Sequence, residues 1–101
     1  MPLKMVDRGK RECPVIVCDH CGKPITDVRD GNYQWKSAGD GKLTDDPVYF
    51  THKECCHAFD QANPGMYGAM DLDCLFVYLA DSLKLDWKAA RGKAAMLDSI
   101  G

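Results

Sequence analysis

The sequence predicts an α+β fold, in which a small β-hairpin unit and a short helix precede a C-terminal helical hairpin. Three observations support this expectation. Short apolar runs separated by turn residues fill the first half of the chain. A helix-capping pattern follows the apolar run VYF at 48–50. In the last thirty or so residues, leucine and phenylalanine recur at the spacing of one helix face.

Length and composition limit the range of functions. The chain has 101 residues, a hydrophobic fraction of 46% and a net charge of −2, so we expect one small domain without bulk attraction to nucleic acid or anionic membrane. The longest apolar run, LFVYLA at 75–80, is too short to span a bilayer. Six cysteines and no secretory leader predict a cytoplasmic protein whose thiols bind metal rather than form disulfides.

The first twelve residues are rich in basic side chains and carry no strong apolar pattern. We expect residues 1–12 to form a flexible basic arm. Its charged residues are Lys4, Arg8, Lys10 and Arg11 on the basic side, and Asp7 and Glu12 on the acidic side.

Residues 13–50 read as a small antiparallel β unit. The run VIV at 15–17 predicts a short strand, and VYF predicts another. Asp30-Gly31 supplies the positive φ angles that a tight hairpin turn requires. Clusters of glycine, aspartate and proline predict two further turns, near residues 40 and 46.

A helix of about ten residues is predicted over 52–61. Thr51 and Glu54 match a capping box, in which the threonine hydroxyl accepts from an early backbone N–H and the glutamate bonds back to the cap. The stretch NPG at 63–65 ends this helix.

Residues 66–101 predict a helical hairpin that packs on the β unit or on a partner. After a linker over 63–69, one helix is expected at 71–84 and a second after a cap at Asp86. The apolar stripe of the first helix is Leu72, Leu75, Phe76, Leu79 and Leu83, and that of the second is Trp87, Ala90, Ala94 and Leu97.

Two cysteine-containing pairs have the spacing of metal ligands. Cys18 and Cys21 form a C-x2-C knuckle, and His52 and Cys55 lie one turn apart on the predicted helix. Three thiolates and one imidazole are the ligand set of tetrahedral structural zinc, and soft sulfur ligands disfavour magnesium and calcium. The other interpretation of these residues is a set of reduced core cysteines or disulfides.

The double cysteine leaves an alternative for the fourth ligand. Cys55 fits the H-x2-C spacing, and Cys56, four residues from His52, is also within reach of the same helix face. Cys56 is otherwise a buried thiol. His57 is rotated off that face, so it is either a surface histidine or a replacement for Cys55.

The order of these features, a knuckle, a hairpin and then ligands in the first turn of a helix, is similar to the layout of a treble-clef zinc finger. The stretch CDHCGKPI followed by HKEC also resembles the first zinc module of a LIM domain over roughly residues 18–60. The resemblance implies one structural zinc ion per chain, held by Cys18, Cys21, His52 and Cys55 in a module spanning 13–62.

The function expected from these features is that of a zinc-stabilised module for protein interaction or assembly. The apolar faces of the C-terminal helices would bind a protein partner or a second copy. A nucleic-acid-binding finger is the alternative, since Tyr33 and Trp35 could stack on bases, although they could equally pack on the hairpin face. Its basic residues would be those of the arm and Lys84, Lys88, Arg91 and Lys93.

An enzyme is not expected. Four good ligands close the site to water, and no carboxylate stands ready as a general base. A small-molecule substrate is therefore not expected either.

Overall fold

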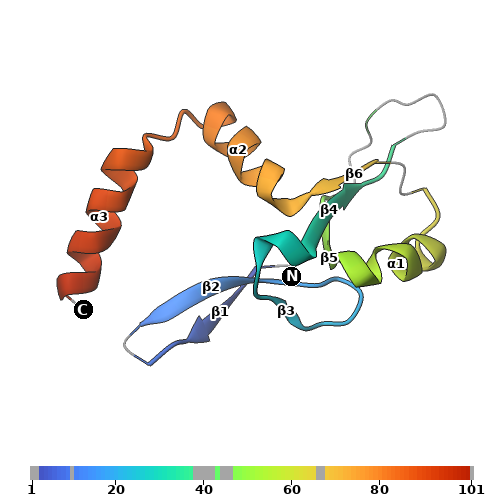
Figure 1. Cartoon of the computed structure of the whole chain (residues 1–101), viewed down its shortest axis with the longest axis horizontal. Helices are drawn as coiled ribbons and strands as arrows, with labels where there is room; N and C mark the ends of the chain where they lie inside the picture. The colour runs from blue at the N-terminus through green and yellow to red at the C-terminus, as the bar shows by residue number, and fades with distance from the viewer. Residues whose placement is uncertain (1–2, 10, 38–42, 44–46, 66–67, 101) are drawn as a thin grey trace.

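A computed structural model describes residues 3–9, 11–37, 43, 47–65 and 68–100. Within these residues the fold is α+β, with two small antiparallel sheets and three α-helices (Figure 1). One sheet has the strand order β1-β2-β3 and the other has the order β5-β4-β6. The α+β fold class is therefore confirmed.

The first sheet contains β1 (Leu3–Asp7), β2 (Glu12–Val17) and β3 (Pro24–Ile25). Strand β1 pairs with β2 along its whole length, from Leu3 opposite Ile16 to Asp7 opposite Glu12. The flexible arm predicted over 1–12 is therefore wrong for these strand residues. Most of the side chains of β1 are exposed, so its order comes from backbone pairing, which leaves little signal in the hydrophobic pattern.

The second sheet contains β4 (Gly31–Trp35), β5 (Tyr49–His52) and β6 (Gly68–Asp71), with β4 in the centre. The hairpin turn predicted at Asp30-Gly31 is wrong, because β3 and β4 belong to different sheets. A short 3₁₀ turn, η1 (Val28–Asp30), lies between them and is capped by the Asp27 carboxylate, which accepts from the Arg29 N–H. The turns predicted near 40 and 46 lie outside the described residues.

Two glycines of the second sheet are needed for close packing. Gly31 has an extended φ of −118°, and a Cβ there would lie 2.7 Å from Leu72 Cδ2. A Cβ on Gly68 would lie 2.0 Å from the Trp35 ring. These two glycines thus let β6 and the start of the following helix pack on β4. The first residues of β6 fall in the predicted linker at 63–69.

The helix predicted over 52–61 is present as a 3₁₀ turn, η2 (Lys53–Cys55), followed by α1 (Cys56–Ala62). The predicted capping box is wrong. Thr51 is a fully buried residue of β5, and its hydroxyl donates to Gln34 Oε1 at 3.1 Å. The buried Gln34 amide in turn donates to Asp60 Oδ1 at 2.5 Å. These buried hydrogen bonds connect β4, β5 and α1. Because the Thr51 hydroxyl bonds to Gln34, it does not cap the helix.

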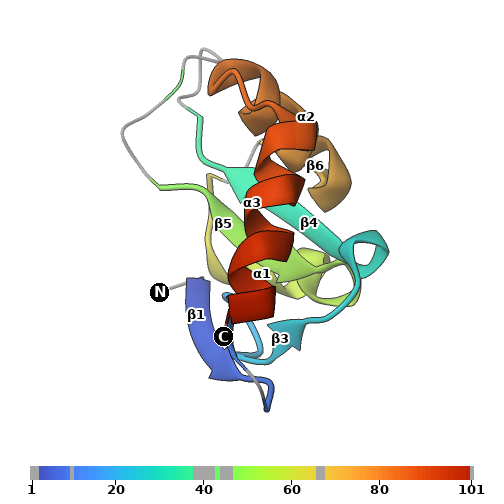
Figure 2. The same ribbon diagram turned by 90° about the vertical axis from the view of Figure 1, so that its left-hand side faces the viewer.

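The last two helices are α2 (Leu72–Ser82) and α3 (Trp87–Ile100). The predicted cap at Asp86 is confirmed, because its carboxylate accepts from the Ala89 N–H at 3.0 Å. The predicted helical hairpin is wrong, since α2 and α3 run in different directions from their connection (Figure 1). Figure 2 shows the C-terminal end of α3 close to β1. The far end of α3 returns to the β1–β2 hairpin, where Arg11 forms an ion pair with Asp98.

The connection between α2 and α3 is ordered by hydrogen bonds. Lys84 adopts a left-handed φ of 55°. Its N–H donates to the Asp81 carbonyl at 3.3 Å, and the Leu85 N–H donates to the Ala80 carbonyl at 2.8 Å. This pair of bonds is the Schellman motif that ends many helices. Together with the Asp86 cap, it sets the direction in which α3 leaves α2.

The core is small and the molecule is elongated. The radius of gyration is 15.8 Å, whereas a compact chain of this length has about 13 Å. Helix α2 packs on β4, η1 and β6, and nearly all described side chains of α3 are exposed. The buried apolar residues in the described part of the chain are Val15, Cys18, Tyr33, Phe59, Leu72 and Ala80.

Candidate metal centre

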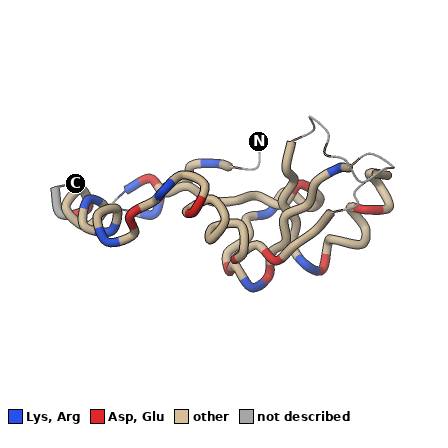
Figure 3. The backbone as a smooth tube through the Cα atoms, turned by 90° about the horizontal axis from the view of Figure 1, so that it is seen from above, with Lys and Arg blue, Asp and Glu red and all other residues tan. Residues whose placement is uncertain are grey.

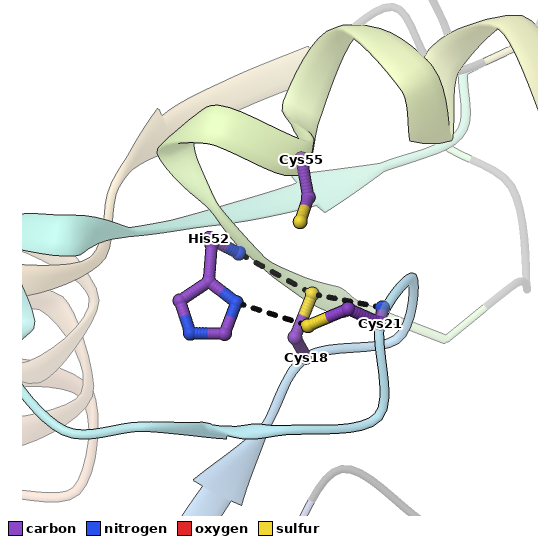
Figure 4. Close-up of side chains that lie close together, drawn as sticks. All are labelled: Cys18, Cys21, His52 and Cys55. Atoms are coloured by element: carbon purple, nitrogen blue, oxygen red, sulfur yellow. Dashed lines mark hydrogen bonds between the residues drawn. The ribbon is translucent and has the colours of Figure 1, made fainter.

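Four side chains from two distant segments converge at one point between the two sheets (Figure 4). They are the predicted ligands Cys18, Cys21, His52 and Cys55, and their ligand atoms all lie within 4.8 Å of one another. Cys21 Sγ and His52 Nδ1 lie 3.4 Å apart. The structure therefore contains a Cys3His group that could hold a metal ion.

The first pair sits in the tight turn between β2 and β3. The Cys18 N–H donates to the Lys23 carbonyl at 2.9 Å, and the Gly22 N–H donates to the Cys18 carbonyl at 3.0 Å. Gly22 has a φ of 76°, a left-handed conformation that glycine adopts without strain. The turn thereby brings both sulfurs to the same side of the backbone.

The second pair comes from the end of β5 and the turn that follows it. His52 is the last residue of β5, and Cys55 is the last residue of η2. Two backbone-directed hydrogen bonds join this segment to the first turn: the Asp19 N–H donates to the Phe50 carbonyl at 2.7 Å, and the Phe50 N–H donates to Asp19 Oδ2 at 2.8 Å. Asp19 and Phe50 are not ligands themselves, but their hydrogen bonds hold the two ligand pairs next to each other.

The imidazole of His52 is oriented for ligation through Nδ1. Its Nε2 lies 3.2 Å from the Pro24 carbonyl oxygen, which can only accept a hydrogen bond. When Nε2 donates to this oxygen, Nδ1 is the nitrogen left to bind a metal, and it lies 3.4 Å from Cys21 Sγ. A backbone partner on the distal nitrogen is the usual way in which a protein fixes a metal-binding histidine.

The environment of Cys18 favours its thiolate. Burial alone would raise the pKa of this thiol, but backbone N–H groups outweigh it and lower the pKa to about 7. The donors are the N–H groups of Cys21, His52 and His20, at 3.4 to 3.5 Å from the sulfur. Hydrogen bonds to the charged form stabilise that form, so Cys18 ionises more readily than an ordinary cysteine.

Cys55 shows the opposite effect. Burial and the nearby sulfurs of Cys18 and Cys21 raise the pKa of its thiol to about 12. Several thiolates cannot occupy this space together unless a cation compensates their repulsion. A divalent metal bound by the three sulfurs would supply the positive charge that three neighbouring thiolates need.

The distances fit zinc. With Zn–S near 2.3 Å and Zn–N near 2.0–2.1 Å, tetrahedral ligand atoms lie about 3.6–3.8 Å apart. The observed separations, 3.4 Å for one pair and at most 4.8 Å for any pair, are within about 1 Å of those values. A Cys3His donor set also matches structural zinc better than a hard cation.

The structure also separates the alternatives for the fourth ligand. Cys55 belongs to the cluster, whereas Cys56 is half-buried outside it and His57 is exposed. His20 takes part only through its backbone N–H. The roles of Asp19 and of the Pro24 carbonyl were missed, because both depend on contacts between segments about thirty residues apart.

The aromatic pair of β4 is used for packing. Tyr33 is buried, its ring lies 5.5 Å from that of Trp35, and its hydroxyl contacts Met70 Sδ. Trp35 is covered by Gly68. These rings therefore belong to the core of the second sheet.

Comparisons with protein-family models, curated proteins and solved structures find no match to this chain. Among the helices that the structure describes, none is long and apolar enough to cross a membrane.

Proposed function

We propose that this chain is a small structural-zinc module of the treble-clef type, and that it acts through protein interaction or assembly. The single observation behind the proposal is the convergence of Cys18, Cys21, His52 and Cys55 on one point between the sheets. One zinc ion bound there would join two sheets that are each too small to be stable alone.

The order of elements supports the treble-clef assignment. A C-x2-C turn closes the β2–β3 pair, the antiparallel pair β4–β5 follows, and the last two ligands lie where β5 passes into the α1 helix. This is the sequence of parts that the resemblance to treble-clef fingers implies, apart from the added strands β1 and β6.

The ligand set supports a structural role for the ion. Catalytic zinc sites keep one coordination position for water or substrate, whereas four protein ligands fill a tetrahedral site. With all four positions occupied by Cys3His, the ion has no place for a reacting molecule. We therefore propose no enzymatic activity.

The surface of the C-terminal helices supports an interaction role. Large apolar side chains of α2 and α3, including Phe76, Leu83, Trp87 and Leu97, are exposed. Apolar surface of this extent on a small chain is typical of an interface with another protein. The zinc unit would then serve as the rigid support from which these helices extend.

Nucleic-acid binding is the weaker alternative. The rings of Tyr33 and Trp35 that could stack on bases are packed in the second sheet. Figure 3 shows acidic residues beside basic ones along the tube, so there is no broad basic stripe in the described part of the chain. A shift of labelled single-stranded or duplex DNA at low salt would favour this alternative over the interaction role.

Metal analysis of the purified protein tests the proposal. We expect one zinc per chain by elemental mass spectrometry. We also expect chelation to abolish the near-ultraviolet circular dichroism of Tyr33 and Trp35, and added zinc to restore it. A metal-free chain with the same spectrum and the same thermal midpoint would overturn the structural-zinc assignment.

A further inference from the structure

The apolar stripe of α2 starts in the core and continues into solvent. Leu72 is 2% exposed, Phe76 is 41% exposed, Leu79 is 44% exposed and Leu83 is 76% exposed. At 100° per residue these four side chains lie within about 60° of one another on one side of the helix. The stripe is therefore one continuous surface, and its exposure increases from the start of the helix to its end.

Helix α3 carries a second uncovered surface. Trp87 and Leu97 are each more than half exposed. The alanines between them, at 90 and 94, leave room for close approach of another helix. An open hollow of about 630 Å³ lies beside Trp87, Lys88 and Arg91, so side chains from another helix could enter next to the indole.

The chain does not cover these two surfaces with each other. Folding α3 back onto α2 would require the connection at 83–86 to reverse, and this connection is fixed at both ends. The Schellman bonds at Lys84 and Leu85 fix its start, and the Asp86 cap fixes its end. A helix that covers either surface would then come from another molecule.

The charges of the two helices are complementary. Helix α2 has Asp73 and Asp81 and no basic residue. Helix α3 has Lys88, Arg91 and Lys93, and its single acid, Asp98, is already paired with Arg11. At 100° per residue, Asp73 lies beside the α2 stripe, and Lys88 and Arg91 lie beside Trp87. These opposite charges at the edges of the two surfaces favour the pairing of α2 with α3 over the pairing of either helix with itself.

We propose that two copies of this chain associate symmetrically, with α3 of each copy packing on the exposed apolar stripe of α2 in the other. This inference names the partner for the interaction role proposed above and rests on it. Because each copy offers both surfaces, one two-fold axis satisfies both contacts at once and leaves neither surface free for a third copy.

The exposed apolar area is sufficient for such a dimer. The five side chains Phe76, Leu79, Leu83, Trp87 and Leu97 together expose on the order of 600 Å² per copy. Two copies would bury about 1,200 Å² of apolar surface, which is within the range of stable interfaces before any polar rim is added.

Sedimentation equilibrium of the full-length, zinc-loaded protein tests the proposal, over about a hundredfold range of concentration. The expected mass is twice that of the chain. Leu83→Lys, which places a charge in the α2 stripe, should raise the dimer dissociation constant by at least about 100-fold. The matched control is Val77→Lys, because Val77 is also exposed on α2, at 57% against 76% for Leu83, but lies away from the stripe. It should leave the mass unchanged.

A charge exchange tests which helices meet. Asp73→Lys alone, and Lys88→Glu with Arg91→Glu alone, should each weaken self-association, and an equimolar mixture of the two chains should restore a heterodimer. A monomer at every concentration, or a dimer that Leu83→Lys and Val77→Lys affect equally, would overturn the proposal. Zinc content is measured on the same samples. A monomer that carries one zinc refutes the dimer alone, whereas a folded chain that carries no zinc refutes the proposed structural-zinc function itself.

Discussion

The double cysteine at 55–56 provides a sharp test of the metal centre. Cys55→Ser and Cys56→Ser are the same chemical change at adjacent positions, and both thiols are half-buried. Only Cys55 belongs to the group whose ligand atoms lie within 4.8 Å of one another. We expect Cys55→Ser to lose zinc and Cys56→Ser to keep it.

The expected loss of zinc affinity in Cys55→Ser follows from the number of ligands. Zinc binding contributes about 10–16 kcal/mol in finger-like peptides, so one ligand of four is worth on the order of 3 kcal/mol. That corresponds to a loss of about 100-fold or more in zinc affinity. The net stability of a domain this size is roughly 5–15 kcal/mol, so Cys55→Ser should also lower the thermal midpoint strongly. Cys56→Ser should cost only about 1 kcal/mol of burial.

Competition with a chromophoric chelator gives the affinity, and circular dichroism gives the midpoint. Equal zinc affinity of the two variants would refute the assignment of Cys55. So would loss of zinc from Cys56→Ser alone, which would make Cys56 the ligand.

Three further predictions concern packing, a helix end and protonation. Gly31→Ala should lower the free energy of unfolding, measured by urea denaturation, by about 1–3 kcal/mol, because the new Cβ would lie 2.7 Å from the Leu72 side chain. The control Gly92→Ala has open space around it and should stabilise α3 by up to about 1 kcal/mol. Lys84→Gly should raise the stability of the chain by about 1 kcal/mol in the same assay, since glycine adopts the left-handed φ of 55° without strain; an unchanged midpoint would contradict this. Zinc affinity should rise about tenfold or more from pH 7 to pH 8. Burial and nearby sulfurs raise the pKa of Cys55 to about 12, and its proton must leave when zinc binds. A zinc affinity that calorimetry finds independent of pH would count against thiolate ligation.

The metal ligands could be predicted because their signal is local. Cys18 and Cys21 form one turn, and His52 and Cys55 form another, so spacing alone identifies each pair. The three helices could also be placed approximately, since their apolar residues recur at helical intervals, and the Asp86 cap was identified by residue type.

The errors share a different cause, which is dependence on distant partners. Strand β1 exists because it pairs with β2, and β6 exists because it pairs with β4. Neither strand has an alternating pattern of its own. Thr51 resembles a helix cap in sequence, but the buried Gln34 takes its hydroxyl. Local rules cannot anticipate such competition, because the competing group lies seventeen residues away.

The same dependence applies to the angle between α2 and α3. Their amphipathic patterns are those of a helical hairpin, and nothing in either stripe specifies which molecule provides the other half. The four-residue connection sets the angle between the helices through Lys84, a residue whose left-handed conformation no propensity rule would favour.

The position of the four ligands between the two sheets bears on how long the protein would survive proteolysis in a cell. One pair lies in the turn between β2 and β3 of the first sheet, and the other lies at and just after the end of β5 in the second sheet, so an ion bound there would join the two sheets. A newly made chain that meets no zinc would remain open to proteases, and a loaded chain would resist them. Under the proposed role, the amount of this protein would follow the supply of zinc without any separate sensor.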